Sequence, residues 1–191
     1  PAVMYVFHAK RQYLDTVIYS RKLIQAGLAA LILSMLFELL WHSVVQNWEY
    51  QNDEHIFNFL MYFFMVAGFL LMGLGVKRNL IWDGVTIASA IAVPIAYFAF
   101  GVKEVIWGVQ LLTLVILSVR ARAVLRDNRM WLFPFFAFGV NMFFIFLLFS
   151  SDNPLYHILH DILGTLLGFA VFGYLFWHNE RYLQRRKAAS E

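Results

Sequence analysis

Six long apolar stretches occupy most of the sequence and constrain what the chain can fold into. A helix needs roughly 20 apolar residues to cross a bilayer core of about 30 Å, and these stretches come close to that length. Backbone groups in lipid must find their hydrogen bonds within the segment, so each stretch is expected to be a helix. The sequence therefore predicts an all-α, polytopic integral membrane bundle of six transmembrane helices. The expected spans are Leu23–Val45, Ile56–Val76, Leu80–Phe100, Val105–Val119, Trp131–Ser150 and Leu155–Trp177.

Composition excludes several other classes of protein. Only 14% of the residues are charged, whereas soluble domains carry about 25%, so an ordinary soluble enzyme is not expected. The chain has no cysteine, which removes disulfides, thiolate metal sites and thiol catalysis. Motifs for phosphate or dinucleotide binding and for serine hydrolases are missing from the sequence as well.

The lysines and arginines predict the orientation of the bundle. Cytoplasmic loops of membrane proteins carry an excess of these residues. If the six spans alternate in direction, 14 of the 15 basic residues fall on one side and only Lys103 falls on the other. Both termini are therefore expected to be cytoplasmic. The 14 residues are Lys10, Arg11, Arg21, Lys22, Lys77, Arg78, Arg120, Arg122, Arg126, Arg129, Arg181, Arg185, Arg186 and Lys187.

The same pattern divides the chain into three parts. Residues 1–22 are expected to form a cytoplasmic or interfacial segment, residues 23–178 the six-helix transmembrane domain, and residues 179–191 a basic cytoplasmic tail. The basic clusters are expected to contact anionic lipid head groups of the bilayer and not nucleic acid. A homo-oligomer, or a subunit of a larger membrane complex, is compatible with this arrangement.

Acids and histidines gather at the opposite end of the expected bundle. Glu38 and His42 lie four residues apart near the end of the first span, so they share one helix face. His55 opens the second span, across a short acidic loop from His42. Ionisable side chains within a membrane usually face the bundle interior and have a partner. The end predicted to be extracytoplasmic is therefore rich in histidine and acid.

The start of the sixth span adds a second group of such residues. His157 is spaced to share a helix face with His160 and with Asp161. Neutral imidazole and carboxylate groups together suit a divalent metal; zinc is the first choice, and iron, copper and manganese are alternatives. The alternative is structural, with the same side chains bonding one another or a neighbouring helix. The predicted metal ligands are His42, His55, His157 and His160.

A resemblance to a known family rests on the same residues. The run YHILHDILG at residues 156–164, with the glutamate of the first span, resembles the superfamily of alkaline ceramidases and progestin/adipoQ receptors. Members of that superfamily are seven-helix membrane hydrolases, or receptors related to them, which hold zinc with three histidines. The resemblance implies that His157 and His160 are zinc ligands and that Glu38 is the acid of the early helix.

These observations favour three functions. The first is a metal-dependent membrane hydrolase acting on a lipid or amphiphile, with Glu38 and Asp161 as the catalytic acids and bases. The second is an accessory subunit of an electron-transfer complex, either free of cofactor or carrying haem b between His42 and one histidine of the sixth span. The third is a small component that binds or transports a solute.

Smaller polar and glycine positions carry structural predictions. Asn141, in the middle of the fifth span, is expected to form an interhelical hydrogen bond. Gly164, Thr165 and Gly168 predict a close contact between two helices. The acid at the start of the third span, Asp83, is expected to act as a helix cap.

Overall fold

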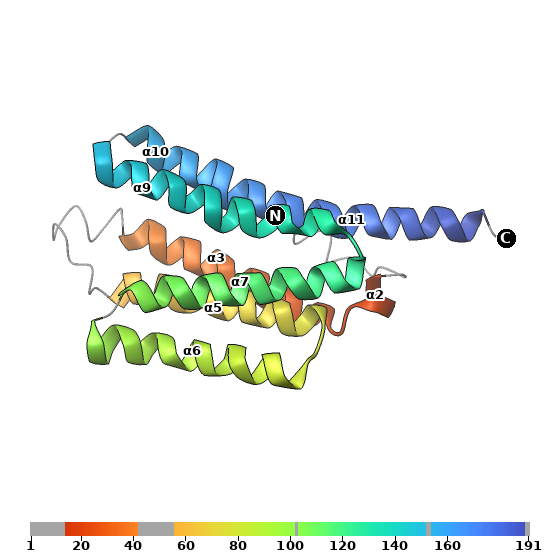
Figure 1. Ribbon diagram of the computed structural model, residues 1–191, viewed down its shortest axis with the longest axis horizontal. Coiled ribbons are helices and arrows are strands. Elements are labelled where there is room, and N and C mark those ends of the chain that lie inside the picture. Colours follow the sequence, from red (N-terminus) through yellow and green to blue (C-terminus); the bar gives the residue numbers. More distant parts are fainter. Residues whose placement is uncertain (1–13, 42–55, 102, 152–153, 190–191) are drawn as a thin grey trace. The chain divides into compact units, whose positions relative to one another are not determined.

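The computed structural model describes residues 14–41, 56–101, 103–151 and 154–189, and every regular element in these ranges is helical (Figure 1). The first four long elements are α3 (Arg21–Leu40), α5 (Ile56–Val76), α6 (Leu80–Phe100) and α7 (Lys103–Leu125), preceded by the short α2 (Leu14–Val17). Two further stretches are built from shorter elements in sequence. These are η2 (Asn128–Trp131), α8 (Leu132–Pro134), η3 (Phe135–Val140) and α9 (Asn141–Ser151), then α10 (Pro154–Leu159), η4 (His160–Leu166) and α11 (Leu167–Ala188).

The lengths and compositions of these helices fit a membrane protein. Five of them are long and apolar enough to cross a bilayer, and the sixth helical stretch of the described chain, from α10 to α11, lies where the sixth span was expected. The expected bounds of the second and third spans coincide with those of α5 and α6. The expected short fourth span is wrong, because α7 runs for 23 residues and is long enough to cross.

The described residues form two compact units, one within residues 19–117 and the other within residues 118–189 together with residues 14–18. In the first unit, α3 and α5 pack closely along their length (Figure 1). Glycines make this contact close: a methyl group added at Gly27 would lie 2.6 Å from the carbonyl oxygen of Gly68. Ser34 adds a buried hydrogen bond from its hydroxyl to the carbonyl oxygen of Met61, at 2.7 Å.

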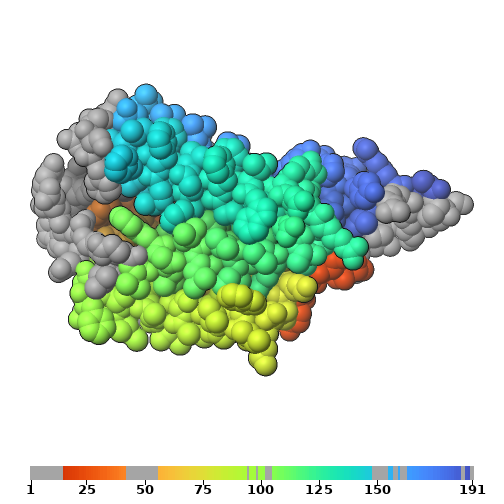
Figure 2. Space-filling model, viewed as in Figure 1, coloured from red at the N-terminus to blue at the C-terminus, as the bar shows by residue number. Residues whose placement is uncertain are grey.

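A second core in the same unit joins α5, α6 and α7. Its buried residues are aliphatic and aromatic side chains at helical spacing, and the rings of Phe59 and Tyr97 lie 5.5 Å apart. Gly101 ends α6 with a φ of 62°, a conformation that glycine adopts without strain. Figure 2 shows the outer atoms of α6 along one edge of the unit. Leu80 and Ile81 there are 86% and 77% exposed, as expected for side chains that face lipid.

The second unit contains two segments of π-helix, η3 and η4, which pack against each other. Around them, a core of phenylalanines joins α8 to α11; the ring of Phe133 lies 4.9 Å from that of Phe172. Hydropathy patterning did not predict the π-helical segments. A π-helical turn contains one more residue than an α-helical turn, and in a uniformly apolar stretch this extra residue leaves no signal.

Candidate functional site

The predicted metal ligands lie largely beyond what the structure describes. His42 and His55 are outside the described residues. His157 lies on α10, and His160 and Asp161 lie on η4, but only their backbone is described. Among the described side chains, no group of three histidines or acids could hold a metal ion. The convergence of these residues on one site therefore stays a prediction.

Glu38 is the one predicted site residue whose side chain is described. It lies on the last turn of α3 and is half-buried. Phe37 beside it stacks on Phe64 of α5, with the rings 5.6 Å apart, so this part of α3 is held against α5. A glutamate at this depth is expected to face protein and not lipid.

A polar contact between two helices is the most distinctive feature of the second unit. The side-chain amide of Asn141, at the start of α9, donates a hydrogen bond of 3.1 Å to the hydroxyl of Thr165 on η4. The expected interhelical role of Asn141 is therefore confirmed. We call this contact, with the glycines beside it, the polar crossing; it comprises Ala137, Asn141, Gly164, Thr165 and Gly168.

Two glycines allow the helices of the polar crossing to approach this closely. A Cβ atom added at Gly164 would lie 2.8 Å from the Cβ of Asn141, and one added at Gly168 would lie 2.9 Å from the backbone nitrogen of Ala137. Neither position has room for a side chain. The close contact predicted for these small residues is confirmed, and it is of the kind that holds membrane helices together.

The amide oxygen of Asn141 has no hydrogen-bond partner among the described residues of the polar crossing. This oxygen is buried and accepts no hydrogen bond within the described structure. An unsatisfied buried acceptor costs about 1–3 kcal/mol, and hydrocarbon offers no water to relieve it. The arrangement therefore holds a polar atom in an unfavourable setting in the middle of the expected fifth span.

Both helices of the polar crossing change to π-helix at this level. η3 ends at Val140, directly before Asn141, and η4 includes Gly164 and Thr165. π-Helical turns inside longer helices occur frequently at functional sites. Together with the buried acceptor, they make the polar crossing a candidate functional site.

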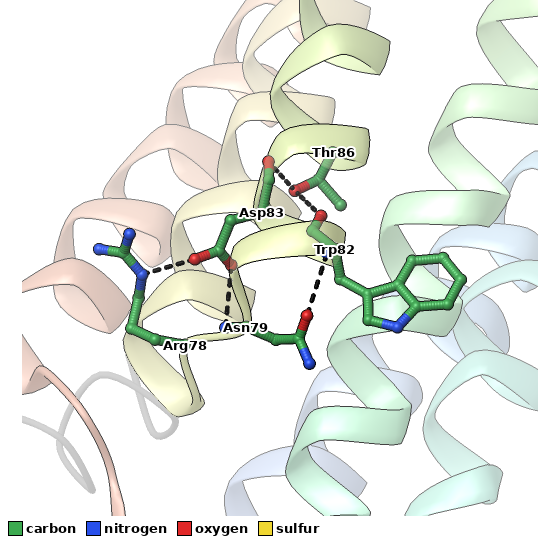
Figure 3. A network of polar contacts seen from close by, with 5 residues as sticks. All are labelled: Arg78, Asn79, Trp82, Asp83 and Thr86. Carbon is green, nitrogen blue, oxygen red and sulfur yellow. Dashed lines mark hydrogen bonds and ion pairs between the residues drawn. The ribbon is translucent and has the colours of Figure 1, made fainter.

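A second polar network closes one end of the first unit (Figure 3). Asn79 caps α6 by accepting a hydrogen bond from the backbone N–H of Trp82 at 3.2 Å. Asp83 is buried, and its carboxylate accepts a hydrogen bond of 2.6 Å from Nε of Arg78. The hydrogen bond and the charge of Asp83 raise the pKa of Arg78 above its ordinary value. Asp83 also accepts a hydrogen bond of 3.5 Å from the backbone N–H of Asn79, so the expected capping role of Asp83 is confirmed, with Asn79 as the N-cap residue itself.

Sequence reasoning missed two buried charged residues in the second unit. Arg120, expected to be a loop anchor, is 5% exposed on α7, and Glu180, beyond the expected end of the sixth span, is 1% exposed on α11. The side-chain amide of Gln184 donates a hydrogen bond of 2.9 Å to Glu180. The spacing in the sequence could have predicted the burial of Glu180. Glu180 follows Phe172 and Phe176 at intervals of four residues and so shares their buried helix face.

Comparison with known proteins assigns the family. A family model described as "Seven transmembrane receptor" matches residues 1–182. The chain therefore belongs to this seven-transmembrane receptor family, and its all-α, polytopic membrane fold is confirmed. No curated protein and no solved structure gives a significant match.

The family assignment corrects two predictions. The resemblance to alkaline ceramidases and progestin/adipoQ receptors is wrong, because the match to the receptor family covers residues 1–182, whereas the resemblance rested on one short run. In that run the two histidines are three residues apart, which any helix with one polar face can produce. The predicted function as a metal-dependent hydrolase is wrong for the same reason. The assignment to the receptor family also overturns the two alternative functions, an electron-transfer subunit and a solute-transport component.

Proposed function

We propose that this chain is a membrane receptor, which binds a ligand at one face of the bilayer and passes a change in helix packing to the other. The match to the receptor family over residues 1–182 carries this proposal. The two helical units support it, since each has its own core and its own close helix contacts. Such an architecture lets one part of the bundle shift while another stays packed.

The ligand-binding end in this proposal is the extracytoplasmic one, with the histidines and acids. The distribution of lysine and arginine supports this orientation. Lys77 and Arg78, both exposed between α5 and α6, would then lie at the cytoplasmic surface. There they would meet anionic head groups, with the exposed Leu80 and Ile81 in the adjoining apolar layer.

The ligand we propose is a divalent cation, with zinc preferred. Four of the six histidines belong to the extracytoplasmic end, and imidazole with carboxylate is a donor set that binds zinc well. In a receptor the cation is the signal, so binding it must change the conformation of the bundle. Binding without such a change would not be receptor function.

A fluorescence experiment tests this proposal. The chain has no cysteine, so Ala188→Cys, at the exposed end of α11, can carry a single environment-sensitive fluorophore. In lipid nanodiscs, zinc chloride is expected to change the emission saturably, while magnesium chloride does not. His160→Ala is expected to weaken the response to zinc by at least about tenfold, because it removes a ligand.

The control substitution is His178→Ala. This residue is half-buried on α11, with its ring 5.8 Å from that of Tyr174, and lies near the opposite end of the chain's last helix. It is expected to leave the zinc response unchanged. Zinc binding measured by calorimetry without any change in emission contradicts the receptor proposal. An equal response in the His160→Ala variant contradicts the role of His160 as a zinc ligand.

A further inference from the structure

The two π-helical segments of the polar crossing lie opposite each other. η3 and η4 pack together, and the helices on either side of them continue as ordinary α-helix. A π-helical turn bonds each N–H to the carbonyl five residues earlier, whereas an α-helical turn uses the fourth. Conversion of η4 to α-helix would therefore shift the register of the chain by one residue.

Such a shift would rotate the helix before η4 relative to the helix after it. One residue corresponds to about 100° of rotation in an α-helix. Because η4 joins α10 to α11, its conversion would rotate α10 relative to α11 by roughly that angle. α10 is the part that carries the start of the expected sixth span, at the histidine-rich end.

The hydrogen bonding of Asn141 gives a reason for two arrangements. In the observed arrangement its amide N–H₂ group has Thr165 as a partner, but its amide oxygen is buried and accepts no hydrogen bond among the described residues. Conversion of η4 would turn Thr165 relative to Asn141, so it would break this hydrogen bond and change the surroundings of the oxygen. The Asn141–Thr165 bond and the glycine contacts favour the observed arrangement, and the unsatisfied oxygen disfavours it.

We propose that the polar crossing is a two-position switch. In the observed position η4 is π-helical and the Asn141–Thr165 bond is formed. In the second position η4 is α-helical, α10 is rotated, and the Asn141–Thr165 bond is broken. The role of this switch in signalling rests on the proposed receptor function. Its existence does not, since no ligand is needed to populate the two positions.

Spin labels can measure the two positions within this unit. Phe143 on α9 and Leu155 on α10 are both exposed, at 57% and 51%, and a cysteine at each position would report the rotation of α10. A second pair, at Phe143 and Tyr174, joins α9 to α11; it is the reference pair, because α11 is held against η3, the element directly before α9, by the close contact of Gly168 with Ala137. Pulsed electron–electron double resonance on the protein in nanodiscs gives the distance distribution of each spin-label pair.

Deletion of Leu163 supplies the reference for the second position, because removing one residue from η4 restores α-helical register. It is expected to move the Phe143–Leu155 distance and to leave the Phe143–Tyr174 distance unchanged. Thr165→Val removes the partner of the Asn141 amide and is expected to raise the population at the second distance roughly tenfold. The same increase is expected for Thr165→Ala, which replaces the valine variant in the experiment if the valine variant does not fold.

Thr113→Val is the matched control, because the Thr113 hydroxyl bonds only to carbonyl oxygens of its own helix, Val109 and Gln110, among the bonds described. It is expected to change neither distance.

Two results would overturn the switch. One is a Phe143–Leu155 distance that the deletion of Leu163 does not move, since no second position then exists. The other is a deletion that moves the distance while Thr165→Val and Thr165→Ala both keep the wild-type distribution. A shift in the Thr165 variants without a zinc response in the fluorescence experiment retains the switch and removes zinc as the proposed ligand of the receptor.

Discussion

Gly27→Ala is expected to lower the melting temperature of the protein by roughly 5–10 °C. The added Cβ would lie 2.6 Å from the carbonyl oxygen of Gly68 and 2.9 Å from the backbone nitrogen of Met72. Backbone atoms cannot move aside as a flexible side chain can, so α3 and α5 must separate. Overpacking of this kind costs about 1–3 kcal/mol or more.

Gly84→Ala is the control for this prediction. Gly84 also lies within a membrane-length helix, α6, but a Cβ added there meets no described atom within 4 Å. Alanine is the better helix former by about 1 kcal/mol, so this variant is expected to be as stable as the wild type or slightly more so. Thermal unfolding followed by tryptophan fluorescence measures both variants. Equal melting temperatures for the two variants would show that α3 and α5 do not pack through Gly27.

Gly168→Ala is expected to lower the melting temperature by roughly 4–8 °C, through the polar crossing of the second unit. The new Cβ would lie 2.9 Å from both the Cβ and the backbone nitrogen of Ala137. Separating the two helices there would also lengthen the Asn141–Thr165 hydrogen bond, which adds to the loss.

Gly139→Ala provides the comparison on the same pair of helices. Gly139 lies in η3, and the nearest described atom to a Cβ added there is Cδ2 of Phe135 at 3.9 Å, an ordinary contact distance. This variant is expected to keep the wild-type melting temperature within about 2 °C. Loss of stability in Gly139→Ala, with Gly168→Ala unaffected, would place the close contact elsewhere.

The sequence was sufficient to predict the membrane fold because length and apolar character decide it. The expected bounds of Ile56–Val76 and Leu80–Phe100 match α5 and α6. The fourth span, expected to end at Val119 directly before Arg120, continues as α7 to Leu125, and Arg120 is buried. Charge alone does not show whether a helix ends or continues out of the membrane.

The candidate site was less accessible to sequence reasoning. The pairing of Asn141 with a polar partner and the close approach at Gly168 follow from small and polar residues in apolar stretches. The π-helical form of η3 and η4, and the unsatisfied oxygen of Asn141, depend on which residues of two helices face each other. The sequence also does not show which glycines lie at a close helix contact. Gly27 and Gly84 are both glycines in apolar helices, and only the fold distinguishes them.

The receptor proposal requires that the end rich in histidine and acid faces outward, and cysteine accessibility tests this most directly. Phe100→Cys and Leu155→Cys mark that end in the two units, while Lys77→Cys and Ala188→Cys mark the opposite end; all four positions are exposed. In intact cells, a membrane-impermeant maleimide is expected to label the first pair, and to label the second pair only after permeabilisation. Labelling of Lys77→Cys and Ala188→Cys in intact cells, with Phe100→Cys and Leu155→Cys protected, would contradict the proposed orientation and with it the receptor as described.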